Sequence, residues 1–235
     1  MSSTTLRVID FFGASSRSPV ERLALLEERK KLRAVGADYS KARLDYDYFD
    51  NPDNPTGYRG YHYDGRFSAA ARRMTEHYGL EPGSSVFELG PAKGFVLAEF
   101  AKLGCRVFGQ DMSSYAVSHC HELVVGRILL EPAPSFPWKD ARFDLVIVKD
   151  MLPHLEPGVL ATTIAELVRI SRGRLFFDIE CGRTEFEQRA MKDWDETHLI
   201  CESPNWWHDE LARHGYCGDV HFKSLITDPG LPDLV

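Results

Sequence analysis

The sequence lacks the long apolar runs that a membrane-spanning protein needs. No stretch approaches the roughly 18 consecutive apolar residues of a spanning helix. The first residues, "MSSTTLRVIDFFGASS", also lack the charged start and apolar block of a secretory signal peptide. We therefore expect no membrane partner.

An excess of basic charge is missing as well. The net charge is -7, and the one cluster of Lys and Arg, at 27–33, also contains acidic residues. A mixed-sign run of this kind is typical of a solvated helix face. Because nucleic-acid binders usually present a basic patch, we expect no nucleic-acid partner.

Paired cysteines are missing too. The five cysteines are odd in number and no two lie close together, which excludes a disulfide framework and a CxxC metal motif. This usage favours a reducing compartment, the cytoplasm. The triplet His119-Cys120-His121 offers three potential ligands, but adjacent residues on a helix point in different directions. We therefore predict no metal site.

From residue 84 onward, short apolar runs alternate with helical patterns. Expected strands cover 85–89, 106–110, 125–130, 143–148, 174–179 and 220–226, and expected helices cover 95–103, 113–124, 157–171 and 203–214. This alternation predicts an α/β fold with a doubly wound, mostly parallel sheet. Whether an antiparallel edge strand follows is left open.

The N-terminal part has a different character. Residues 1–17 look irregular, a helix is expected over 18–35, and 36–65 holds most of the tyrosines together with Asp-Asn-Pro turn signals. This stretch is too polar for a core and too aromatic for a plain linker. We predict an N-terminal helical, Tyr-rich cap that serves as a lid over 1–65, followed by a cofactor-binding domain over 66–235.

The stretch "SVFELGPAKG" at 85–94 indicates where a ligand binds. Ligands of open parallel sheets lie beyond the carboxyl ends of the strands, where Gly90 and Gly94 bracket a turn. Asp111 ends the next strand, in position to accept hydrogen bonds from ribose hydroxyls. This much also suits a nicotinamide dehydrogenase.

Glu88 distinguishes a nicotinamide site from a site for a positively charged ligand. A carboxylate two residues before Gly90 would be repelled by a pyrophosphate but attracted by a ligand that carries an ammonium and a sulfonium. The G-x-G-x-x-G spacing is also not met. We interpret the pattern as a site for S-adenosylmethionine; the alternative is that Glu88 caps a backbone turn and binds nothing.

At three motifs the chain resembles the class I S-adenosylmethionine-dependent methyltransferases. These are "FELGPAKG" at 87–94, "GQDMSS" at 109–114 and "FPWKDARFDLVIVKDMLPHL" at 136–155. The resemblance covers about 58–225 and implies a Rossmann-like fold. "GYHYDGRF" at 60–67 and "CESPNWWHDELARHGYCGD" at 201–219 resemble a subgroup associated with glycan and secondary-metabolite pathways.

The resemblance also implies cofactor contacts. Glu88 orients the amino group, Asp111 takes the ribose hydroxyls, Met112 packs on the adenine, and the backbone of Lys149 lies near the amino-acid end. The methionine end is lined by the backbone at Gly90, Pro91, Ala92 and Gly94. Glu131 is the nearest carboxylate for the adenine amino group, although two prolines shift the family spacing there.

The Tyr-rich stretch 44–66 is the expected lid over the acceptor. Its aromatic walls and hydrogen-bonding groups are Tyr58, Tyr61, His62, Tyr63 and Arg66. Arg66 is expected to pair with the cofactor carboxylate, and Tyr63 is counted with it as cofactor-binding. The alternative is that these tyrosines only pack a cap on the domain.

Two histidines are candidates for a general base, because imidazole titrates near neutrality. His154 follows the fourth expected strand of this domain, at the active-site edge, and His62 lies in the lid. The alternative for His154 is a helix cap. The predicted function is methylation of an oxygen or nitrogen of a small polar molecule, sugar-like or a secondary metabolite. The alternative is a protein that binds S-adenosylmethionine without catalysis or without methylation.

Overall fold

The computed structural model describes residues 6–13, 18–34, 44–54 and 56–231. Within these residues no helix is long and apolar enough to cross a membrane. The five cysteines are all free.

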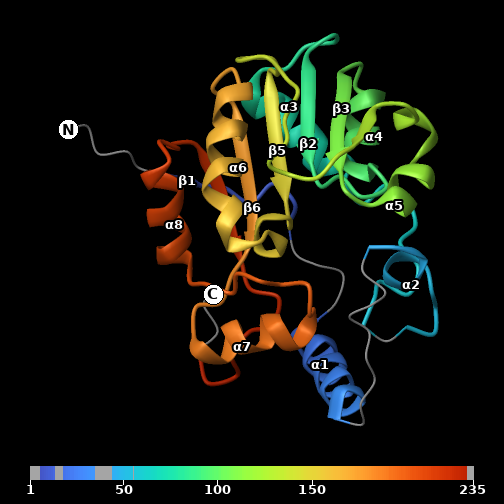
Figure 1. Cartoon of the computed structure of the whole chain (residues 1–235), viewed down its shortest axis with the longest axis vertical. Coiled ribbons are helices and arrows are strands. Elements are labelled where there is room, and N and C mark those ends of the chain that lie inside the picture. Colours follow the sequence, from blue (N-terminus) through green and yellow to red (C-terminus); the bar gives the residue numbers. More distant parts are fainter. Residues whose placement is uncertain (1–5, 14–17, 35–43, 55, 232–235) are drawn as a thin grey trace.

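A seven-stranded sheet forms the centre of the molecule (Figure 1). Its order is β1-β7-β6-β5-β2-β3-β4, and every neighbouring pair is parallel. The strands are β1 (Arg7–Val8), β2 (Ser85–Leu89), β3 (Arg106–Asp111), β4 (Ile128–Leu130), β5 (Leu145–Lys149), β6 (Leu175–Glu180) and β7 (Asp219–Lys223). The chain order reverses beside β2, so β2, β3 and β5 end where ligands of such sheets bind.

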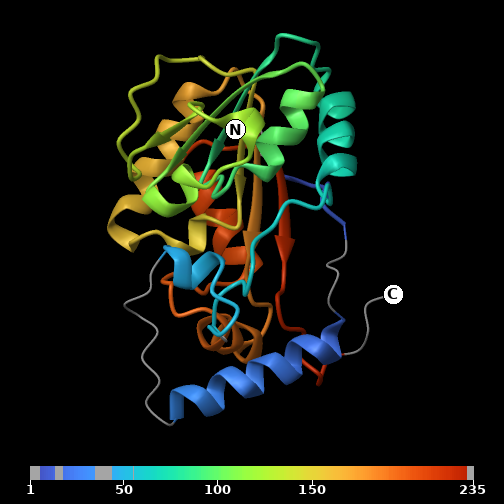
Figure 2. The same cartoon turned by 90° about the vertical axis from the view of Figure 1, so that its right-hand side faces the viewer.

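Helices cover both faces of the sheet (Figures 1 and 2). They are α1 (Pro19–Ala34), α2 (Tyr46–Phe49), α3 (Ser68–Tyr78), α4 (Phe95–Lys102), α5 (Ser114–Ser118), α6 (Pro157–Ile170), α7 (Glu185–Trp194) and α8 (Pro204–Arg213), with 3₁₀ turns η1 (Glu122–Val124) and η2 (Leu152–His154). The doubly wound, Rossmann-like α/β fold predicted from the sequence is confirmed.

Alternating side chains of the central strands build one core on each face. On β5, Val146 and Val148 pack in the cluster that contains residues of α6 and α8. Leu145 and Ile147 pack in the cluster that contains residues of α3 and α4. Because both faces are covered, the strand is apolar along almost its whole length.

Several expected elements differ from the structure. The helix expected over 113–124 is broken into the short α5 and the turn η1, and the chain start contributes the edge strand β1 instead of being irregular throughout. Helix α7 was not expected, although Thr184 and Glu187 have capping-box spacing, and the Thr184 hydroxyl accepts a hydrogen bond from the Glu187 N–H at 3.2 Å. Among the described residues the sheet has no antiparallel strand.

Two helices lie beyond the carboxyl edge of the sheet. Figure 2 shows α1 and α7 side by side below the strands, where Leu26 of α1 packs against Ala190 of α7 and Ile226. The division of the chain at residue 65 stays a prediction; β1, from the first part, lies in the same sheet as the strands of the second.

The two adjacent tryptophans of α8 give a test of this packing. Trp207 is fully buried in the core, whereas Trp206 is only half-buried. Trp207→Ala leaves a large cavity and should lower the free energy of unfolding by about 3–5 kcal/mol. Trp206→Ala, the matched control, should cost clearly less in urea-induced unfolding. Equal losses would contradict this placement of α8.

Candidate functional site

The turn between β2 and α4 is shaped by backbone in the left-handed region. Gly90, Ala92 and Gly94 have φ of 71°, 51° and 72°. A Cβ atom on Gly90 would lie 2.6 Å from Cγ of Met151, so this position combines a positive φ with a close neighbour. The turn therefore directs the chain from the tip of β2 into the N-terminus of α4, whose first N–H groups have no helical partner.

Glu88 is a buried carboxylate inside β2. Its Oε2 atom has no hydrogen-bond partner among the described residues. Burial raises the pKa of Glu88 to about 8; Lys149 opposes the shift, and Asp111 and Asp150 add to it. A buried polar oxygen without a partner is costly, so Glu88 is a candidate for contact with a bound group.

Asp111 ties the tip of β3 to the glycine turn. Its Oδ2 accepts a hydrogen bond from the Ala92 N–H at 2.8 Å, and its Oδ1 accepts one from the Ser113 N–H at 2.8 Å. Burial raises its pKa, although these two bonds act in the opposite direction. The side chain of Met112 is exposed beside it, and Glu131 at the end of β4 is also exposed.

Residues 44–54 and 56–67, which we name the tyrosine segment, lie against this turn. Asp50 accepts hydrogen bonds from Lys93 Nζ at 2.7 and 2.6 Å and from the Tyr115 hydroxyl at 2.6 Å. Lys93 Nζ also donates to the backbone oxygen of Tyr61, whose ring stacks on Phe95 at 4.7 Å. The segment is thus bonded to the turn that the sequence assigns to the cofactor.

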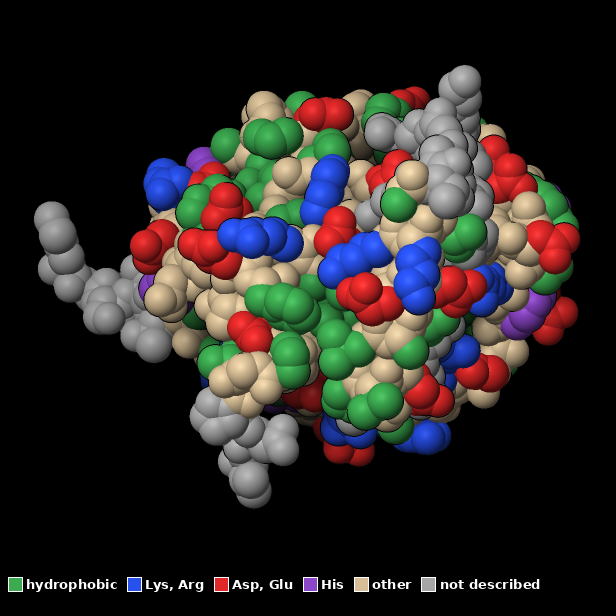
Figure 3. All heavy atoms as spheres, turned by 90° about the horizontal axis from the view of Figure 1, so that it is seen from below, with side chains coloured by type: hydrophobic (Ala, Val, Ile, Leu, Met, Phe, Trp, Pro, Cys, Tyr) green, Lys and Arg blue, Asp and Glu red, His purple; other side chains and the backbone are tan. Residues whose placement is uncertain are grey.

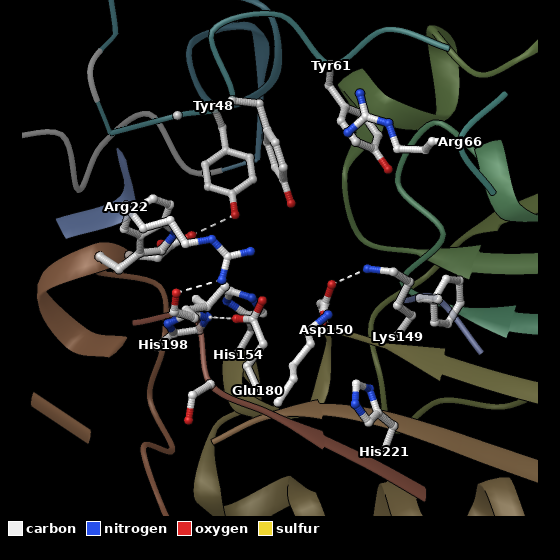
Figure 4. A pocket seen from close by; sticks show the side chains of 18 of the residues that line it. Arg22, Tyr48, Tyr61, Arg66, Lys149, Asp150, His154, Glu180, His198 and His221 are labelled. Carbon is white, nitrogen blue, oxygen red and sulfur yellow. Dashed lines mark hydrogen bonds and ion pairs between the residues drawn. The ribbon is translucent and has the colours of Figure 1, made fainter. Parts of the chain in front are cut away.

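A cavity of about 640 Å³ lies between the carboxyl ends of β5, β6 and β7 and helices α1, α2 and α7 (Figure 4). Its aromatic lining consists of Phe12, Tyr48, Tyr58, Tyr61, Phe67 and Trp194. Its titratable lining includes Arg66, Lys149, Asp150, His154, Glu180, Asp195, His198, His221 and Lys223. The cavity combines apolar walls with several polar groups, which is typical of a small-molecule site.

Two lysines and two aspartates form one charged cluster at the strand ends. Lys149 pairs with Asp150 and lies 4.0 Å from Asp178, and Lys223 pairs with Asp150 and lies 3.0 Å from Asp178. Burial opposes the charged form of Lys149, but the two aspartates override it and raise its pKa. Both lysines therefore stay protonated, and Lys149, which lines the cavity, also acts to lower the pKa of Glu88.

A second polar cluster lies at the other side of the cavity. His154 Nδ1 is 2.8 Å from the Thr197 hydroxyl, which donates to Asp195 Oδ1 at 2.6 Å. The His154 and His198 rings are 4.5 Å apart, and His198 Nε2 is 3.0 Å from Glu180 Oε2. Figure 4 shows His154, His198 and Glu180 gathered in one corner.

Two histidines in this corner have opposite pKa shifts. Burial lowers the pKa of His154, and the neighbouring His198 lowers it further. Burial also disfavours the charged form of His198, but Glu180 overrides this and raises the pKa of His198 to about 9. At neutral pH His154 is therefore an unprotonated imidazole beside a charged pair.

The structure separates the predicted residues into two groups. Glu88, the turn at 90–94 and Asp111 come together at one edge, and Tyr58, Tyr61, Arg66, Lys149 and His154 line the cavity. Arg66 is paired with Asp64 at 2.7 Å. His62 is exposed and is not among the residues that line the cavity, and the Tyr63 hydroxyl bonds to Glu99 and Lys102.

Sequence reasoning missed Tyr48, Asp195 and His198. The last two lie in "DETH" at 195–198, which follows the unexpected helix α7. The capping signal at Thr184 could have located α7, and the loop after it would then have been expected near the carboxyl edge. No pattern in the sequence indicates that Tyr48 donates to Asp195, at 2.8 Å.

One segment of the chain, which contains most of the candidate cofactor residues, is similar to a known protein family. Residues 87–177 match the family model described as a methyltransferase domain. No curated protein matches the chain.

Solved structures show the same fold. A SAM-dependent methyltransferase from Archaeoglobus fulgidus matches with a TM-score of 0.51 and 17% identity, over 63% of this chain and 66% of that one. A Bacillus halodurans protein provisionally assigned as a methyltransferase matches with a TM-score of 0.52 and 18% identity, over 62% and 68%. At this identity the likeness establishes the fold.

The matched segment includes Glu88, the glycine turn, Asp111, Lys149 and His154. Together with the fold, it supports the predicted enzyme class, an S-adenosylmethionine-dependent methyltransferase with that cofactor. The subgroup, the acceptor and the roles of single residues stay predictions.

The raised pKa of Glu88 gives a test of its environment. In the unfolded chain this carboxyl ionises near its ordinary pKa, whereas the folded protein keeps its proton up to about pH 8. Stability should therefore fall as the pH rises between these values, by up to about 1.4 kcal/mol per pH unit. Glu88→Gln removes this dependence.

Urea unfolding of the wild type and of Glu88→Gln at pH 5, 6, 7 and 8 measures the difference. The advantage of the variant should grow with pH. An exposed control, Glu185→Gln, should follow the wild type. Parallel curves for the wild type and Glu88→Gln would show that the carboxyl is solvated.

Proposed function

We propose that this protein transfers a methyl group from S-adenosylmethionine to an oxygen or nitrogen of a small polar molecule held in the cavity. The observation that carries the proposal is the buried Oε2 atom of Glu88, which has no hydrogen-bond partner within the described residues and lies beside the glycine turn. An ammonium group of the cofactor would satisfy this oxygen and favour the ionised carboxylate.

The residues at this edge fit the parts of the cofactor. Glu88 would hold the amino group, and Asp111 would hold the ribose hydroxyls while keeping its bonds to the turn. The backbone at 90–94 would line the methionine end, and Arg66 would leave Asp64 to pair with the carboxylate. Met112, exposed next to Asp111, would cover the adenine.

The chain's part in the reaction is positioning and proton removal. S-adenosylmethionine would supply a methyl group on a sulfonium, and in-line attack by the acceptor oxygen or nitrogen would release the neutral thioether S-adenosylhomocysteine. The tyrosine segment closes the cavity from one side, and Asp50 bonds it to Lys93 of the turn. His154, unprotonated and in the cavity wall, is the group in position to take the acceptor's proton.

The cavity favours a small acceptor with hydroxyl or amino groups. Its volume of about 640 Å³ suits a molecule of roughly drug size. Aromatic walls and hydrogen-bonding side chains together suit a sugar-like or secondary-metabolite acceptor. Acidic and basic side chains are interspersed on the face seen in Figure 3, and this face shows no basic field suited to nucleic acid.

Asp111 gives the first test of the cofactor site. Asp111→Ala removes the acceptor of the ribose hydrogen bonds and should weaken S-adenosylhomocysteine binding by about 1–3 kcal/mol, roughly 5- to 150-fold. Isothermal titration calorimetry measures this, with Asp209→Ala on the surface of α8 as the control. Tight binding of NAD by the wild type, or unchanged affinity of Asp111→Ala, would contradict the assignment.

His154 tests catalysis separately from cofactor binding. His154→Ala should lower turnover roughly 10²- to 10⁴-fold, because the proton acceptor is lost. Its affinity for S-adenosylhomocysteine should stay at the wild-type level. Methyl transfer to hydroxylated and amino acceptors is followed with radiolabelled cofactor, and His208→Ala on the surface of α8 serves as the control. Cofactor binding without transfer to any acceptor would favour the non-catalytic alternative.

A further inference from the structure

We propose that His154, Asp195 and His198 form a binding site for a divalent transition-metal ion in the wall of the cavity. One ligand atom from each of the three lies within 4.8 Å of the others. All three residues line the cavity. His154 comes from η2 and the other two from the loop after α7, so the fold brings together donors that are about 40 residues apart.

The donors already have the outer partners that hold metal ligands in place. His198 Nδ1 is 3.0 Å from the backbone oxygen of Met191, which leaves Nε2 as the ligand atom. Thr197 joins His154 Nδ1 to Asp195 Oδ1, and Tyr48 donates to Asp195 Oδ2 at 2.8 Å. Imidazole ligands commonly donate their second N–H to a carbonyl, and ligating carboxylates are themselves hydrogen-bonded.

The donor set selects the class of ion. Two imidazoles and one carboxylate suit zinc and the neighbouring divalent transition metals, whereas magnesium and calcium prefer oxygen ligands. Three protein ligands leave one position open, the arrangement of catalytic rather than structural zinc. Because the ligands line the cavity, the open position faces the space that the acceptor would occupy.

Glu180 competes with the ion for the Nε2 atom of His198. His198 Nε2 lies 3.0 Å from Glu180 Oε2, so an ion must replace the proton that the two groups share. Glu180 also lines the cavity and stays beside the ion as a further carboxylate.

The inference deepens the proposed function and rests on it for the identity of the acceptor. A hydroxyl bound at the open position of a metal ion loses its proton more readily than a free one. With the ion bound, His154 acts as a metal ligand and not as the general base. The ion then favours loss of the proton from the acceptor hydroxyl. The ion also orients the acceptor oxygen within the cavity.

Metal titration of the tag-free, chelator-treated chain tests the site. Calorimetry with ZnCl₂ should show one saturable site per chain, and Co²⁺ should develop the visible absorption of a site with nitrogen ligands. His154→Ala and Asp195→Asn should abolish this binding. Thr197→Val, which keeps the shape but loses both outer hydrogen bonds, should weaken it about 10- to 100-fold. His208→Ala, exposed on α8, should bind as the wild type does.

The variants are compared only after circular dichroism shows the wild-type fold. No saturable binding of Zn²⁺ or Co²⁺ by the wild type, or unchanged binding by His154→Ala, would overturn the inference. Titration of the same samples with S-adenosylhomocysteine keeps the two proposals apart. Cofactor binding without metal binding refutes the metal site alone, whereas metal binding without cofactor binding supports the metal site and refutes the proposed function.

Discussion

The burial of one carboxylate inside a strand is the constraint on which the site depends. Glu88 occupies a position where an apolar side chain would pack at no electrostatic cost, and burial raises its pKa to about 8. A protein that keeps such a group gives up stability at neutral pH. The cost is offset when a cation binds beside it, because the carboxylate then ionises in the company of an opposite charge.

This constraint explains the arrangement of the charged groups around it. Lys149 opposes the raised pKa of Glu88, but it is itself shared with Asp150 and Asp178 and does not bond to the free oxygen. If a protein side chain fully neutralised the Glu88 carboxylate, a cationic ligand would gain no electrostatic free energy by binding beside it. Lys149 compensates Glu88 only in part, so a cationic ligand beside Glu88 would gain free energy from binding there.

Features set by local sequence patterns could be predicted, whereas features that depend on contacts between distant residues could not. The apolar strands and the glycine turn are local patterns, and they located β2, β3, β5 and β6 along with Glu88 and Asp111. The corner at His154 depends on α7 and on the loop after it, which meet the sheet only through long-range packing. Tyr63 and His62 were placed by their membership in an aromatic stretch, and side-chain direction within such a stretch has no sequence signal.

The two polar clusters of the cavity divide the chemistry between them. On one side, two lysines and two aspartates pair at the strand ends, near Glu88, where we propose that the cationic donor binds. On the far side, an unprotonated His154 lies beside the charged pair of His198 and Glu180, which suits the activation of an acceptor. Methyl transfer needs the electrophile and the nucleophile on opposite sides of the moving carbon. Under the proposed function, the side of Glu88 would hold the methyl donor and the side of His154 the acceptor, with the aromatic segment bonded to the turn through Asp50.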